Sequence, residues 1–164
     1  MKLLSALFLM AVAGAAPAAD EVVFREPFSL RLHLDKEHYA QYPIGKVPFV
    51  HNGAVYLYNG ESFGLRVDVE NGVVKSLGYT PDAAQADVSL DLRQNIKADG
   101  SSMMLLTIVN HTKYKLDMLA LMVTPNSKQP AATSIIPIEP GMTNFESWPH
   151  PIVQLVLHKL KVQM

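Results

Sequence analysis

Apolar and polar residues alternate over several stretches of the chain, as they do in strands with one buried face. In residues 28–34, four apolar side chains fall on one face, while Ser29, Arg31 and His33 fall on the other. Residues 63–69 alternate in the same way. Both segments are therefore predicted as β-strands.

A hairpin is predicted where Asn71-Gly72 separates the second of these strands from another apolar run, 73–77. Asn-Gly favours a type I′ turn, because both central residues of that turn need positive φ angles. In this hairpin we expect Asp68 to lie opposite Lys75 as a favourable cross-strand pair.

Two runs, 103–109 and 116–123, are apolar on both faces, which is typical of strands that are covered on two sides. The polar residues 110–113 between them predict a hairpin connection. Asn110-His111-Thr112 also fits a glycosylation sequon, which we interpret as turn residues. Further strands are predicted at 47–50, 54–58, 88–92, 134–138 and 152–160.

Helical signals are limited to two short segments. Residues 80–86 contain a cap residue, a proline at the first helical position and three alanines, which predicts one or two turns. Residues 35–39 are predicted to form one more turn. The long stretches without a strand pattern are 35–46, 93–102, 124–132 and 139–151.

The spacing of these strands predicts the fold class. Short strands at intervals of about ten residues, separated by turn residues, are typical of antiparallel sandwiches and barrels. We expect an all-β, two-sheet antiparallel sandwich of the immunoglobulin-like kind, with a small β-barrel as the alternative. Residues 20–164 are expected to form this single domain.

The first nineteen residues predict export. Lys2 precedes an apolar run over 3–13, and Ala16-Pro17-Ala18 matches a signal peptidase site, with cleavage after Ala18 or Ala19. The apolar run is too short to span a bilayer, which takes about 20 residues. We expect a signal peptide over 1–19, a periplasmic or secreted protein, and no membrane span in the mature chain.

Composition excludes several classes of site. The chain has no cysteine, which rules out disulfides, thiol catalysis and Cys-ligated metal centres. An exported domain without disulfides depends on strand pairing and core packing. The net charge of -1 gives no reason to expect a nucleic-acid partner.

Tyrosines are the first candidate binding residues. If Val55 and Leu57 point into the core, Tyr56 and Tyr58 lie side by side on the outer face of their strand. Tyr39 and Tyr42 lie in the predicted loop after the first strand. Tyrosines are enriched at interfaces, although covering a sheet face is an equally good interpretation for this group.

Residues 140–151 are the second candidate, because they carry the only tryptophan, Trp148, and a histidine, His150, that lies between two prolines. Proline fixes φ, so this loop is expected to be rigid. We predict that Phe145 plugs one end of the core, and leave Trp148 and His150 open between core packing and recognition.

Metal and catalytic motifs are weak. The six histidines show no i, i+2 spacing on a strand and no H-E-x-x-H motif. Met103, Met104, Met118 and Met122 fit core packing better than a Cu(I) site. No nucleophile elbow, phosphate loop or dinucleotide fingerprint is present. We predict no catalytic residue, no metal site and no cofactor.

The leading hypothesis is a non-enzymatic binding or accessory module that recognises another envelope protein through loops and an edge strand. The candidate binding residues are Tyr39, Tyr42, Tyr56, Tyr58, Trp148 and His150. A small-ligand or metal (Cu/Zn) carrier is the alternative, and an envelope hydrolase is the second alternative.

Overall fold

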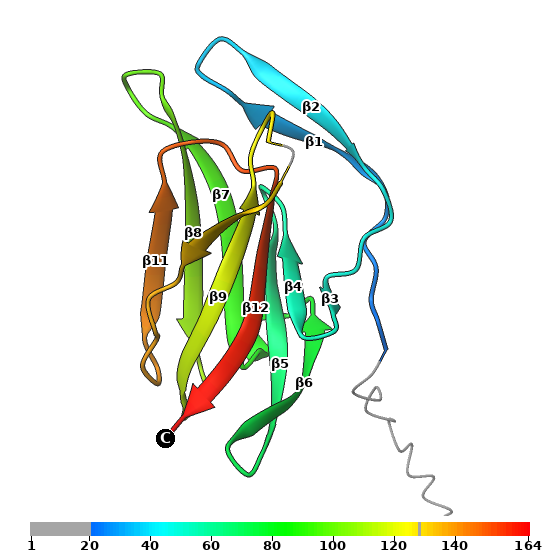
Figure 1. The fold of residues 1–164 in the computed structure, drawn as a ribbon, viewed down its shortest axis with the longest axis vertical. Coiled ribbons are helices and arrows are strands. Elements are labelled where there is room, and N and C mark those ends of the chain that lie inside the picture. The colour runs from blue at the N-terminus through cyan, green and yellow to red at the C-terminus, as the bar shows by residue number, and fades with distance from the viewer. Residues whose placement is uncertain (1–20, 128) are drawn as a thin grey trace, which may run out of the picture.

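The computed structural model describes residues 21–127 and 129–164, which form two antiparallel β-sheets packed as a sandwich (Figure 1). The predicted all-β sandwich is confirmed. Its finer immunoglobulin-like arrangement and the single-domain boundaries stay predictions. The predicted signal peptide lies outside the described residues.

Ten strands make up the two sheets. Sheet 1 has the order β10-β9-β12-β4-β3 and sheet 2 the order β11-β8-β7-β5-β6. The strands of sheet 1 are β3 (Val50–His51), β4 (Ala54–Leu57), β9 (Lys115–Val123), β10 (Ala131–Ser134) and β12 (Gln154–Gln163). The strands of sheet 2 are β5 (Ser62–Glu70), β6 (Val73–Thr80), β7 (Val88–Ile96), β8 (Ser102–Asn110) and β11 (Thr143–Trp148).

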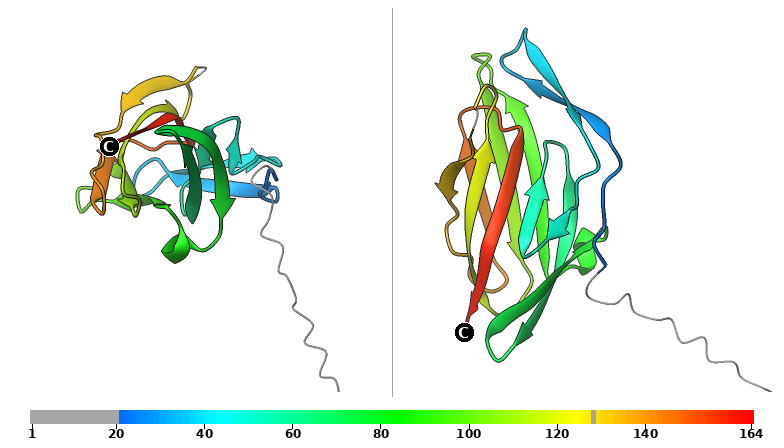
Figure 2. Two further views of the ribbon diagram at one scale, coloured as in Figure 1. Left: turned by 90° about the horizontal axis from the view of Figure 1, so that it is seen from below. Right: turned by 45° about the vertical axis from the view of Figure 1, so that its right-hand side comes forward.

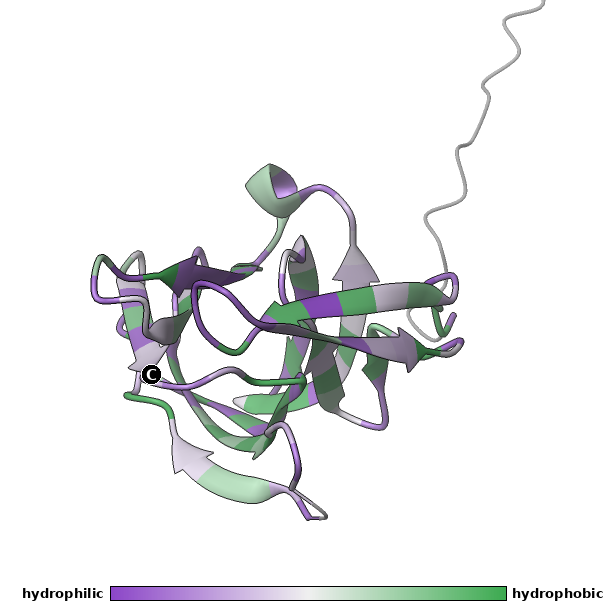
Figure 3. Cartoon of the chain, turned by 90° about the horizontal axis from the view of Figure 1, so that it is seen from above, coloured by the Kyte–Doolittle hydropathy of each residue, from purple (hydrophilic) through white to green (hydrophobic). Residues whose placement is uncertain are grey.

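The main core lies between the sheets. Leu92 and Leu106 from sheet 2 and Leu155 from sheet 1 have no exposed surface. Burial alternates along central strands such as β7 and β8, so that one side of each sheet supplies the core, and apolar residues recur along these strands (Figure 3). This packing takes the place of the disulfides that the chain lacks.

A separate hairpin covers one end of the sandwich. It consists of β1 (Phe28–His33) and β2 (Tyr39–Ile44), which pair only with each other. Its buried residues Leu30 and Leu32 pack with Tyr58 in a second cluster, called here the hairpin core. The hairpin tip extends past the ends of the other strands (Figure 2).

The loop predicted over 35–46 is therefore wrong, and so is the helical turn at 35–39. Residues 39–44 form β2, where Pro43 is tolerated because β2 is an edge strand. Asp35 instead shapes the turn between β1 and β2, where its carboxylate accepts hydrogen bonds from the backbone N–H groups of Glu37 and His38, both at 2.8 Å.

The hairpin predicted across 110–113 is also wrong, because β8 and β9 belong to different sheets. The connection crosses from sheet 2 to sheet 1. β8 and β9 are both apolar on two faces, but they do not pair with each other. Asn110 makes this crossing possible: it is fully buried, and its Nδ2 donates to the carbonyls of Tyr114, Ile138 and Glu139. This position fits its interpretation as a turn residue.

The predicted β5–β6 hairpin forms, with Asn71 at φ 53° and Gly72 at φ 74°, but its predicted Asp68–Lys75 pair does not. A β-bulge between Asp68 and Val69 shifts the register, so that Asp68 lies opposite Ser76. Lys75 Nζ is instead 3.0 Å from Glu70 Oε2.

The remaining differences concern four further segments, two of them at sheet edges. The strand predicted at 134–138 is wrong, because β10 covers Ala131–Ser134 and ends where that prediction begins, and the loop predicted over 139–151 contains β11. β7 extends to Ile96, beyond the predicted 88–92. The helix predicted in 80–86 is the 3₁₀ turn η1 (Ala83–Gln85), capped by the Asp82 carboxylate. Short edge strands are paired on one side only, so their apolar pattern is weak.

Candidate functional site

The structure does not bring the six predicted binding residues together. Tyr39 and Tyr42 lie on β2 rather than in a loop, and they point to opposite faces of the hairpin. Tyr39 is 50% exposed, and the guanidinium of Arg31 lies 3.8 Å from the centre of its ring. Tyr42 packs on the hairpin core. Only Tyr39 is available on the surface as the prediction requires.

Tyr56 and Tyr58 do not form the predicted exposed pair. Val55 and Leu57 are buried as expected, and Tyr56 is half-buried. Tyr58 is only 2% exposed, because β4 ends at Leu57 and the strand alternation stops there. Its hydroxyl accepts a hydrogen bond from Gln154 Nε2, and burial raises the pKa of this phenol. Tyr58 is a core residue.

In the 140–151 segment the structure buries Trp148, whose role was left open, and not Phe145. Trp148 is 7% exposed, and its Nε1 donates to Thr133 Oγ1 at 3.0 Å. Phe145, which was predicted to plug the core, is 63% exposed on β11. His150 is half-buried, with its Nδ1 3.2 Å from the Pro151 carbonyl oxygen. This segment packs against the sandwich rather than forming a recognition loop around Trp148.

One Ser–His pair lies within hydrogen-bond distance, as in hydrolases that activate a serine. Ser89 Oγ is 3.0 Å from His111 Nε2, but the same hydroxyl donates to the Ala83 carbonyl at 2.6 Å. Because a hydroxyl has one proton, His111 must donate to Ser89 and does not act as its base. The pair therefore joins β7 to the Asn110 corner and gives the hydrolase alternative no support.

The candidate metal ligands and the methionines are not arranged as a metal site in the described residues. In residues 21–127 and 129–164, no three His, Asp or Glu side chains are grouped so that they could hold a metal ion. Met104 and Met118 lie in the main core with 0% and 5% exposure. Met118 fills space between the sheets, as expected for core packing.

The two long sides of the sandwich differ in whether hydrogen bonds join the edges of the two sheets. On one side, the edge strands β10 and β11 are joined across the sheets by the Trp148–Thr133 hydrogen bond. A second link runs from the Ile136 N–H to Glu146 Oε1 at 2.8 Å. The opposite side, where the edges are β3 and β6, has no such links within the described chain.

At this second side the N-terminal segment is fixed beside β3. The Arg25 N–H donates to the Val47 carbonyl, and the Phe49 N–H donates to the Val23 carbonyl, both at 3.0 Å. The Arg25 side chain forms a salt bridge with Glu61, with Nε 2.7 Å from Oε1. This segment forms one wall of a groove, and β6 forms the other.

The outer edge of β6 presents unpaired backbone. On β5, the Leu65 carbonyl accepts a hydrogen bond from the Asp87 N–H, and the Val67 N–H donates to Asp87 Oδ2. Both groups therefore point to the side of β5 where β7 lies. In an antiparallel ladder this direction alternates, so Arg66 pairs with Gly78 of β6. Leu77 and Tyr79, the residues on either side of Gly78, therefore point their N–H and C=O groups away from β5. In the described chain no other strand pairs with β6.

A continuous groove runs along this edge, and we call it the open seam. Three adjoining hollows of about 270, 280 and 280 Å³ share lining residues along the length of β6. The lining residues are Gly72–Tyr79 on the β6 side, with Glu21–Val23, Val50–Gly53 and Lys159–Val162 on the other side. The seam is thus as long as the edge strand.

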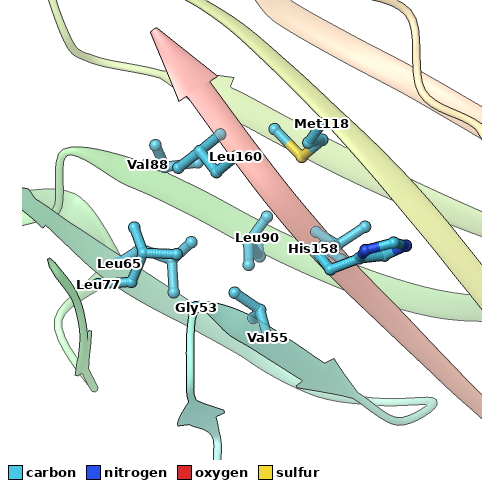
Figure 4. Close-up of a pocket in the computed structure, with 10 residues that line it drawn as sticks. Gly53, Val55, Leu65, Leu77, Val88, Leu90, Met118, His158 and Leu160 are labelled. Atoms are coloured by element: carbon cyan, nitrogen blue, oxygen red, sulfur yellow. The ribbon is translucent and has the colours of Figure 1, made fainter. Parts of the chain in front are cut away.

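The floor of the open seam is apolar. Beneath Leu77 and Leu160, side chains from both sheets converge on a cavity of about 10 Å³, whose lining includes Leu65, Leu90 and Met118 (Figure 4). A cavity of this size holds about one water-sized group. The seam therefore leads from exposed backbone directly to the main core.

The wall of the open seam opposite β6 is also an unpaired strand edge where it is formed by the C-terminal half of β12. β4 pairs with β12 only at Leu155–Leu157, and a bulge follows between His158 and Lys161. Lys159, within this bulge, has a φ of 54°. The C-terminal half of β12 pairs with β9 alone, so both walls of the lower seam are strand edges.

None of the six predicted residues lines the open seam. An edge strand was predicted to take part, but the pattern of residues 73–77 does not show that this strand lies at an edge. The run Val73-Val74-Lys75-Ser76-Leu77 would look the same in a strand paired on both sides.

No family model matches the chain, and no curated protein or solved structure is similar to it. No helix in the described parts of the chain has the length and apolar character needed to cross a bilayer.

Proposed function

We propose that this chain is a non-enzymatic binding module that takes up an extended segment of a partner protein as an additional strand on β6. The observation that carries the proposal is the outward-facing backbone of Leu77 and Tyr79 beside an apolar groove. Strand addition uses such edges: main-chain hydrogen bonds supply affinity, and pockets for alternate side chains supply specificity.

The dimensions of the open seam suit one strand. β6 has eight residues, so an added strand of the same length spans about 26 Å at about 3.3 Å per residue. Every second side chain of that strand would face the floor, and the others would face solvent. β6 offers a single free strand edge, which favours a peptide segment over a whole sheet.

β6 also carries features that limit indiscriminate pairing. Lysines and bulges protect edge strands from aggregation, and β6 has both, because Lys75 is the extra, unpaired residue of its bulge. An accepted partner must accommodate Lys75, so the edge is selective.

Export is the second part of the proposal. The positive residue, apolar run and small-residue site in residues 1–19 support delivery to the periplasm or outside the cell. Another envelope protein is the partner in that compartment. The absence of cysteine does not conflict with this location, because the main core and strand pairing hold the sandwich together.

The absence of cysteine also permits a direct test. Peptides that bind the protein are first selected from a displayed library of random 12-residue sequences. Ser76→Cys, in the open seam, and Ser134→Cys, on the edge strand β10, are then each labelled with a bulky maleimide.

The label at position 76 is expected to abolish peptide binding, while the unlabelled Ser76→Cys protein and the labelled Ser134→Cys protein bind normally. Failure to select any peptide, or equal binding by both labelled proteins, would overturn the proposed function.

A further inference from the structure

We infer that the segment bound in the open seam is acidic, with Asp or Glu side chains between small apolar ones. This inference rests on the proposed function and names the chemistry of its partner. Lys75, Lys159 and Lys161 all line the seam. Glu21 is the acidic residue that lines it, at the end near Tyr79.

The two lysines of β12 supply the strongest attraction. Lys159 and Lys161 are exposed, and among residues 21–127 and 129–164 no carboxylate lies within 4.0 Å of either ammonium group. Lys75 lies across the groove, where Glu70 partly neutralises it at 3.0 Å. A strand added to β6 along this groove would therefore have lysines on both sides.

A second copy of this chain does not fit the charge pattern. Pairing through β6 would bring its residues Val73–Thr80 into the seam, and these carry Lys75 and no carboxylate. That segment would add like charge to a positive groove, which is unfavourable. Charge complementarity therefore selects a different protein, one with acidic side chains.

The floor limits the apolar side chains of the partner. The cavity beneath Leu77 and Leu160 holds about 10 Å³, enough for one small group. Residues such as Ala or Val fit the inward positions at this point, whereas an aromatic ring would have to displace core side chains. The expected segment thus alternates small apolar residues with acidic ones.

Three synthetic peptides test this chemistry. Each has eight residues with Val or Ala at alternate positions, and Glu, Lys or Ser at the others. We expect the Glu peptide to bind about tenfold more tightly than the Lys peptide at 50 mM salt, with the Ser peptide between them. The difference should fall below about threefold at 500 mM salt, because exposed charges are screened.

Charge reversal provides the matched control. The Lys159→Glu/Lys161→Glu protein should lose the preference for the Glu peptide, or reverse it. Lys97→Glu/Lys113→Glu changes the net charge equally at exposed positions that do not line the seam, and should keep the preference.

The outcomes separate this inference from the proposed function. Equal affinity for the three peptides, or tighter binding of the Lys peptide, overturns the acidic partner; strand addition survives if the Ser76 label still blocks binding. Binding that the Ser76 label does not block, or no binding by any peptide, overturns both. Loss of the preference in the Lys97→Glu/Lys113→Glu control shows an effect of net charge alone and also overturns the inference.

Discussion

Arg25 is a charged residue with only 5% of its surface exposed, and each of its side-chain nitrogens donates a hydrogen bond. Nε and Nη2 bind the Glu61 carboxylate, and the remaining bonds reach the carbonyls of Val47, Pro48 and Tyr56. The guanidinium also lies 4.1 Å from the centre of the Phe49 ring. A planar group with donors on two edges suits this position, whereas an ammonium group does not.

Replacing Arg25 with Leu is expected to lower the free energy of unfolding by about 3 kcal/mol or more, because it leaves the Glu61 carboxylate partly buried without its partner. Urea denaturation measures this loss. Arg93→Leu removes an exposed ion pair with Asp91 and should cost less than about 1 kcal/mol. Similar losses for both variants would contradict the role given to Arg25.

Asp35 predicts a pH dependence at the hairpin turn. A hydrogen bond from His38, together with the backbone N–H groups of Glu37 and His38, lowers the pKa of this carboxyl from 3.8 to about 2. The ionised form is favoured by folding, so its contribution is fully present above pH 3.8 and is lost as the pH falls toward 2.

In a carbon-13 NMR titration, the Asp35 carboxyl should have its midpoint near pH 2, and His38→Ala should move that midpoint toward 3.8. Asp99, whose pKa is lowered mainly by hydrogen bonds from Ser101, serves as the internal reference and should not move. An unchanged Asp35 midpoint in His38→Ala would show that the histidine is not the main cause.

Among the elements, the connection between β8 and β9 depends on one buried amide. Besides donating to three carbonyls, Asn110 accepts hydrogen bonds at Oδ1 from the N–H and the hydroxyl of Thr112. The Asn110 backbone also binds Gly141 and Met142, so β8, β9 and the start of β11 meet at this corner.

Asn110→Ala is expected to destabilise the protein by about 2–4 kcal/mol, because one buried and two partly buried hydrogen bonds to carbonyls are lost together. Thermal unfolding followed by circular dichroism measures the effect. Asn95→Ala, at an exposed position, is the control and should change stability by less than about 0.5 kcal/mol. A small effect at position 110 would mean that the corner forms without this amide.

The alternation of apolar and polar residues predicted the central strands of the sheets better than the edge strands. β5, β8 and β9 were identified because their apolar residues pack on the main core, which makes local pattern and burial agree. β2 and β11 were missed because Pro43 and the polar residues of 143–147 obscure the alternation. The Asn71-Gly72 turn was predictable, but the bulge that moves Lys75 was not.

Strand order explains why the candidate site was missed. Whether 110–113 joins two strands of one sheet or crosses between sheets depends on contacts far apart in the sequence. The same holds for β6, which becomes an edge only because β7 pairs with the other side of β5. Tyr58 and Trp148 were predicted as candidates by residue type, and the fold buries both.

At the scale of the whole molecule, the sandwich and the β1–β2 hairpin are two units with separate cores. Gln94 of β7 joins them: its Oε1 accepts from the His33 N–H at 2.9 Å, and its Nε2 donates to the His33 carbonyl at 2.7 Å. A second link runs from the Lys36 N–H to the Gly100 carbonyl. Few hydrogen bonds and the small hairpin core thus hold the hairpin to the sandwich, so we expect the hairpin to open first.

Gln94→Ala should increase amide exchange in β1 and β2 about tenfold, because it removes about two hydrogen bonds worth roughly 0.5–1.5 kcal/mol each. Exchange in the central part of β8 should change little. An equal increase in both regions would mean that hairpin and sandwich unfold as one unit.

Strand addition at β6 is the central claim, and amide exchange on the nitrogen-15-labelled protein tests it most directly. With a selected peptide bound at saturation, the Leu77 and Tyr79 amides should exchange more than about tenfold more slowly than in the free protein. The Gly78 amide, which faces β5, should change much less. A saturating peptide that leaves the Leu77 and Tyr79 amides at their free rates would contradict the account.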